Sequence, residues 1–190
     1  MIDNQCQKPT YESREIPSGL NEIWTTGRYS DITLITDTKK FKAHKVILAA
    51  NSPVFDTIFN NHMKDRSSDE VYLKNIKESV VKTFLDFLYT GKIEENGDQN
   101  LGELFSIASK FKVAKLTSIV EKLITINLND ENALEFLKLG CLFNCDKMKV
   151  STFNVLKSMF DFPLKEDLMN QPEAIEKLIE AKQNFDSSLK

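Results

Sequence analysis

The stretch that decides the fold covers residues 29–59 and reads YSDITLITDTKKFKAHKVILAANSPVFDTIF. In its first part Ile32 and Leu34 alternate with polar neighbours, which predicts a β-strand over 31–36. A second, shorter alternation follows over 41–43. The two segments are separated by only a few residues, so they are expected to pair as a β-hairpin.

Helices are predicted for the remainder of this stretch. A continuous block of helix-forming apolar residues covers 46–50 and stops at Asn51. Ser52 can cap a new helix, and Pro53 is tolerated at a first helical position. Apolar side chains then follow at helical spacing, namely Val54, Phe55, Ile58 and Phe59. The stretch therefore predicts a hairpin, a buried helix and a capped second helix.

The same residues resemble the signature of BTB/POZ domains. The resemblance is carried by the segments 30–32 (SDI), 41–49 (FKAHKVILA) and 52–55 (SPVF), and by a second motif at 87–91 (FLYTG). It spans roughly residues 20–128, within the boundary error of such comparisons. These sequence motifs are most similar to those of the speckle-type POZ branch. The resemblance implies an α+β BTB/POZ fold, in which a small β-sheet is flanked by a cluster of helices and followed by an all-helical C-terminal extension.

Three parts are expected along the chain. Residues 1–16 are polar and aperiodic, which predicts a flexible tail, and residues 17–128 form the expected BTB/POZ domain. Residues 129–190 continue with helical periodicity. They resemble the helix pair that binds cullins in related adaptors, followed by a last helix near 172–182.

Several helix ends are marked by residues with special backbone roles. Gly27 and Gly91 stand where helices are expected to end, because glycine adopts the left-handed conformation of a C-terminal cap. Asn100 and Glu103 have the spacing of a capping box. The pair 129–130 (Asn-Asp) is expected to cap the first helix of the extension.

The bulk composition excludes several classes of function. The 25 basic and 28 acidic side chains give a net charge of −3, so no basic excess is present for nucleic-acid binding. The apolar runs are too short to cross a membrane, and the first twenty residues lack the apolar block of a secretory signal. Three cysteines without paired spacing predict a reducing compartment, the nucleus or the cytoplasm.

The sequence contains few residues that could form an active site. Its two histidines are His44 and His62, and His44 is expected to be a hydrogen-bonded structural residue rather than a base. Cys141 and Cys145 lack the second pair that a zinc site needs, so Cys141 is interpreted as core. The lysines within 39–45 are interpreted as a solvated face. No enzymatic activity, cofactor or metal is therefore expected.

A dimer interface is predicted at the N-terminal side of the domain. Leu20, Ile23 and Trp24 share one face of a helix before the first strand, and in the family this helix packs against its twin in a second chain. The alternative is that Trp24 covers its own core. In BTB domains the residues matching Asp31 and Lys45 face each other in a partly buried pocket at this interface. The resemblance implies an ion pair that specifies packing, or, as in repressor-type relatives, a pocket for a co-repressor.

A cullin-binding surface is implied by the resemblance at the end of the third helix. Cullin-binding relatives carry a hydrophobic-x-Glu pattern there, and this chain has Ile58, Phe59 and Asn60, so the carboxylate is missing. An asparagine still forms hydrogen bonds but loses their charge-assisted part. The candidate contact residues are Phe55, Ile58, Phe59, Asn60, His62 and Met63.

The expected function is that of a protein-interaction adaptor. It would form a homodimer, dock the N-terminal domain of cullin-3 and bring an unidentified substrate for ubiquitination. The alternative is a BTB dimerisation or transcriptional co-repressor platform without cullin binding. Speckle-type relatives carry a substrate-binding MATH domain before the BTB core, but fewer than thirty residues precede Tyr29 here. Either the chain is a fragment, or its substrate is recruited by the tail, by the C-terminal helices or by a partner.

Overall fold

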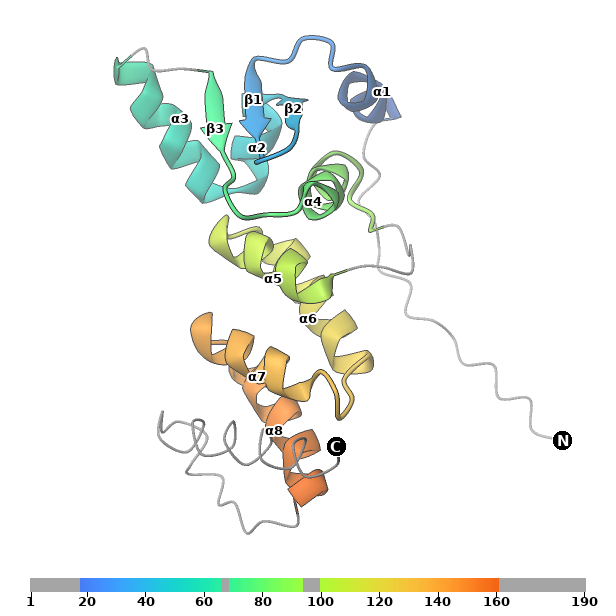
Figure 1. Cartoon of the computed structure of the whole chain (residues 1–190). Coiled ribbons are helices and arrows are strands. Elements are labelled where there is room, and N and C mark those ends of the chain that lie inside the picture. Colours follow the sequence, from blue (N-terminus) through green and yellow to red (C-terminus); the bar gives the residue numbers. More distant parts are fainter. Residues whose placement is uncertain (1–17, 66–68, 94–99, 161–190) are drawn as a thin grey trace, which may run out of the picture. The chain divides into compact units, whose positions relative to one another are not determined.

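The computed structural model describes residues 18–65, 69–93 and 100–160 (Figure 1). It separates into two compact units, residues 1–99 and residues 100–190, each of which is described by itself. The expected N-terminal tail and the expected last helix near 172–182 lie outside the described residues. No helix in the described part is long and apolar enough to cross a membrane.

The first unit mixes short strands with helices, whereas the second contains helices throughout its described part. The elements of the first unit are α1 (Ser18–Thr26), β1 (Ile32–Ile35), β2 (Lys40–Ala43), α2 (Lys45–Asn51), α3 (Pro53–Asp65), β3 (Glu70–Tyr72) and α4 (Glu78–Thr90). Those of the second are α5 (Leu101–Lys110), α6 (Ala114–Ile126), α7 (Ala133–Leu142) and α8 (Asp146–Phe160). This order confirms the predicted α+β class.

The sheet has three strands in the order β2-β1-β3 (Figure 1). β1 and β2 form the predicted antiparallel hairpin, with Ile32 opposite Ala43, and β3 pairs with β1 in parallel. Ile32 and Leu34 point into the core, as do Phe41 and Ala43 from the neighbouring strand. The alternation seen in the sequence is thus the alternation between the two faces of the sheet.

The predicted helix boundaries in this unit are confirmed. The Ser52 Oγ accepts a hydrogen bond of 3.2 Å from the backbone N–H of Phe55, and α3 begins at Pro53. α4 ends at Gly91, whose φ of 68° lies in the left-handed region. Its N–H donates to the Phe87 carbonyl at 2.8 Å. Side-chain and glycine caps therefore satisfy backbone groups that these helices leave unpaired.

In the second unit one predicted cap is confirmed and one is wrong. The Asn100 Oδ1 accepts from the Glu103 N–H at 3.0 Å, which caps α5 as predicted. Asn129 does not cap α7, which begins only at Ala133. Its Oδ1 instead accepts from the N–H of Asn132 at 3.1 Å. The asparagine side chain closes a local turn before the helix, a competing use that its short amide allows.

One buried cluster of the second unit lies between α7 and α8. This cluster joins the two helices through Ala133, Leu137, Phe153 and Leu156. Cys141 packs against this cluster as a partly buried residue, in agreement with its predicted core role. The two helices approach closely at Gly140, where an added Cβ would lie only 3.2 Å from the backbone nitrogen of Lys149. A side chain at this position would therefore require the start of α8 to shift by a few tenths of an ångström.

Candidate protein-interaction site

Helix α3 turns two aromatic side chains into the core of the first unit. Phe55 is fully buried, and Phe59, one turn later, is 8% exposed. Their rings stack with centroids 5.8 Å apart and an interplanar angle of 16°. Positions four apart lie on the same side of a helix, so this pair fixes the rotation of α3 about its axis.

The opposite side of α3 is accessible and polar. Asp56, Thr57, Asn60 and Asn61 are exposed. The Asn60 Nδ2 donates a hydrogen bond of 3.2 Å to the Asp56 Oδ1. Ile58 is half-buried. Side chains two positions apart on a helix do not face each other, so Ile58 and Asn60 project to different sides of the accessible half of α3.

The residues predicted from the sequence to contact cullin thus fall into an accessible group and a buried group in the structure. Ile58 and Asn60 are accessible to a partner, whereas Phe55 and Phe59 are enclosed by their own unit and stabilise α3. His62 and Met63 continue the helix, but their side chains lie outside the described part. A hydrophobic pattern at helical spacing does not by itself separate the buried face from a contact face.

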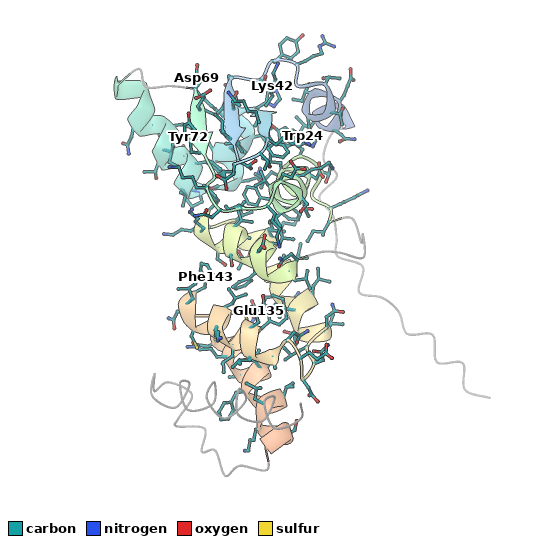
Figure 2. The ribbon with its side chains drawn as sticks, in the orientation of Figure 1. Trp24, Lys42, Asp69, Tyr72, Glu135 and Phe143 are labelled. Carbon is teal, nitrogen blue, oxygen red and sulfur yellow. The ribbon has the colours of Figure 1, made fainter. Side chains whose placement is uncertain are left out.

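Trp24, predicted to lie at a dimer interface, has partners within its own chain (Figure 2). Its indole Nε1–H donates to the Asp86 Oδ1 at 2.7 Å. Its ring stacks on that of Tyr89, with centroids 4.9 Å apart and an angle of 16°. Lys82 donates to the second oxygen of Asp86 at 2.7 Å. These contacts join α1 to α4. They correspond to the alternative interpretation of the sequence, in which Trp24 covers the core of its own chain.

The prediction of a hydrogen-bonded structural role for His44 is confirmed. His44 is 5% exposed, and its Nε2 lies 2.7 Å from the Arg28 carbonyl oxygen. Because a carbonyl can only accept, Nε2 carries the proton in the neutral ring and Nδ1 accepts. Nδ1 lies 2.7 Å from the Tyr89 hydroxyl, which therefore donates to it. The same hydroxyl accepts from the backbone N–H of His44 at 2.9 Å. Tyr89 was not singled out by the sequence, although it stands inside the recognised motif at 87–91.

Burial of Tyr89 predicts a loss of stability at high pH. Burial raises the pKa of its hydroxyl from 10 to about 12. Since the folded-state pKa exceeds the unfolded one, the protonated phenol stabilises the fold fully below pH 10, and this contribution is lost as the pH rises towards 12. A shift of this size corresponds to about 2–3 kcal/mol. The slope of unfolding free energy against pH between 10 and 12 should be smaller in Tyr89→Phe than in the unmodified chain. Equal slopes would contradict the assignment.

The ion pair predicted between Asp31 and Lys45 is not formed. Asp31 is exposed, and its Oδ1 accepts a 2.8 Å hydrogen bond from the backbone N–H of Lys45, at the start of α2. The Lys45 Nζ instead pairs with the Asp69 carboxylate, which comes just before β3. The first N–H groups of a helix need acceptors, and the ring of His44, the N-cap residue, is used elsewhere. Asp31 therefore supplies the acceptor for α2 from a distant part of the chain.

The described residues contain no group of three or more His, Cys, Asp or Glu placed to hold a metal ion. Cys141 and Cys145 are free thiols. Burial raises the pKa of both thiols, which favours the protonated form over the thiolate that a nucleophile or a zinc ligand requires.

Comparison with known proteins identifies the family. The family model described as BTB/POZ domain matches residues 20–128, more than half of the chain. The chain belongs to the BTB/POZ domain family. The match agrees with the extent of the resemblance seen in the sequence. BTB/POZ domains are modules of protein interaction, which supports the coarse prediction of an adaptor. The finer resemblance to the speckle-type branch stays a prediction.

Two further proteins are similar to parts of the chain. Mouse "Kelch-like protein 41" is 27% identical over 157 residues, which cover 83% of this chain and 26% of the relative. The chain therefore spans about a quarter of the length of that curated relative. The solved structure "BTB domain of zebrafish PATZ1" is 27% identical in sequence, with a TM-score of 0.50. The match covers 62% of this chain and 98% of the chain in that structure.

Proposed function

We propose that this BTB/POZ protein is a homodimeric adaptor of the nucleus or cytoplasm that docks the N-terminal domain of cullin-3 and brings a substrate for ubiquitination. The observation that carries the proposal is the division of α3 into a buried aromatic side and an accessible side. Phe55 and Phe59 hold the helix in place, and Ile58 and Asn60 remain available to a scaffold. A docking helix fixed in this way loses little conformational freedom on binding.

The proposed homodimer draws support from apolar side chains that the single chain leaves accessible. Val46 on α2 is 71% exposed, and Tyr29, between α1 and β1, is 78% exposed. Leu20 and Ile23 on α1 are half-buried. Because Trp24 already has partners within the chain, these apolar residues are the better candidates for contact with a second copy.

The proposal predicts that Asn60→Glu tightens cullin binding. A carboxylate at this position restores the charge-assisted hydrogen bond of the hydrophobic-x-Glu pattern, worth a few-fold to about tenfold in affinity. The measurement is calorimetric titration of the purified chain with the cullin-3 N-terminal domain, with light scattering to establish the dimer and the expected stoichiometry of two cullins per dimer. Asn61→Glu is the matched control, since Asn61 is the next residue of α3 and is also exposed.

Two results would count against this proposal. If a folded, dimeric chain fails to bind at cullin concentrations of tens of micromolar, docking is excluded. If Asn60→Glu and Asn61→Glu change the affinity equally, the docking surface lies elsewhere. The alternative function, a platform that binds a co-repressor peptide beside Asp31 and Lys45, is less favoured because both side chains are already engaged within the chain.

A further inference from the structure

The accessible side of α3 lacks a glutamate at position 60 but carries a carboxylate one turn earlier. Asp56 is exposed, and position 56 lies on the same side of the helix as position 60. The hydrogen bond from the Asn60 Nδ2 to the Asp56 Oδ1, 3.2 Å long, joins the two side chains. Asn60 thereby restricts the rotation of a carboxylate that would otherwise move freely in solvent.

This pair presents hydrogen-bond acceptors to a partner. Because the amide nitrogen of Asn60 donates to Asp56, the amide oxygen is left as an acceptor. In the part of the chain that the structure describes, Asp56 Oδ2 and Asn60 Oδ1 form no further hydrogen bond or ion pair. Two neighbouring acceptors, one of them an oxygen of the negatively charged Asp56 carboxylate, match the donors of a guanidinium or an ammonium group.

We propose that Asp56 supplies the anionic contact of the docking surface in place of the missing glutamate, with Asn60 as its positioning residue. The group opposite them on the cullin scaffold is an arginine or a lysine. This inference rests on the proposed function and names the chemistry of the same surface. It also gives the Asn60 amide a role, because the amide orients the carboxylate on the preceding turn. Asn60→Glu removes this donor and places a second carboxylate one turn from Asp56, so its gain in affinity is expected at the few-fold end of the range given above.

Asp56 also has a structural role that any test must separate from docking. It lies in the first turn of α3, where a negative charge stabilises the helix through the partial positive charge of its N-terminus. Glu78 lies in the first turn of α4 in the same unit and is also exposed. Glu78→Gln therefore removes a charge from a helix start without touching α3, which makes it the matched control.

The test is calorimetric titration of the full dimeric chain and its variants with the cullin-3 N-terminal domain at low and high salt. Asp56→Asn is expected to raise the Kd about tenfold and to reduce its dependence on salt, because an ion pair across the interface is lost. Asp56→Glu should retain most of the affinity. Glu78→Gln should leave the Kd unchanged. Asn60→Ala should weaken binding about threefold in the unmodified chain and by a smaller factor in the Asp56→Asn background, where only the contact of its own amide oxygen is left to lose.

The outcomes separate this inference from the function on which it rests. If the unmodified chain binds cullin-3 and Asp56→Asn binds equally well at both salt concentrations, the role of Asp56 is overturned and the adaptor function stands. If Asp56→Asn and Glu78→Gln weaken binding by the same factor, a general charge effect replaces the specific contact. If the folded dimer does not bind at all, both proposals fall.

Discussion

Replacing Tyr89 with phenylalanine is expected to lower the free energy of unfolding by about 2–4 kcal/mol, although the change removes a single oxygen atom. The Tyr89 hydroxyl accepts from the His44 backbone N–H and donates to the His44 Nδ1. Both groups lie in a residue that is only 5% exposed, so water cannot readily replace the lost partner. A buried polar group left without a partner costs more than the net worth of the hydrogen bond it made.

The measurement for Tyr89→Phe is denaturant unfolding followed by the fluorescence of Trp24, the one tryptophan of the chain. Trp24 stacks on Tyr89 and therefore reports on the unit in which the change is made. Tyr72→Phe is the matched control, because Tyr72 is 59% exposed and its hydroxyl donates to Glu70 at the surface. The control should shift stability by less than about 0.5 kcal/mol. A Tyr89→Phe effect as small as that of the control would contradict the hydrogen-bond network.

Much of the fold could be predicted because the relevant signals are local in the sequence. The alternation of Ile32 and Leu34, the cap at Ser52 and the left-handed Gly91 each depend on neighbours within a few positions. Such patterns follow from the periodicity of strands and helices and from the backbone groups left free at helix ends. The strands and helix caps they predict agree with the structure in the first unit.

The partners of polar side chains could not be predicted in the same way. Trp24 bonds to Asp86, 62 positions away, and Asp31 caps a helix that begins 14 positions later. Several acceptors compete for each donor, and their three-dimensional arrangement decides between them. For this reason Lys45 was matched to Asp31, whereas the structure pairs its ammonium group with Asp69. The types of the charged residues could be read from the motif, but the contact partner of each side chain could not.

The second large effect is expected at Phe55, where replacement by alanine should lower the free energy of unfolding by about 3–5 kcal/mol. Phe55 is fully buried and stacks on Phe59, so the change leaves a cavity beneath α3 and removes an aromatic contact. Natural domains are stable by only about 5–15 kcal/mol, so this loss is a large fraction of the total. Unfolding followed by Trp24 fluorescence measures it in the same unit as the substitution.

Ile58→Ala is the matched comparison for Phe55→Ala, because it also removes an apolar side chain from α3. Ile58 is half-buried, so its loss should cost only about 1 kcal/mol of stability while weakening cullin binding. Phe55→Ala should weaken binding only to the extent that it unfolds the unit, so its effect should vanish where the variant remains folded. A stable Phe55→Ala variant that no longer binds would show that Phe55 contacts the partner directly. The helix would then have to turn its aromatic side outward on docking, and the accessible side containing Asp56 and Asn60 would not be the surface used.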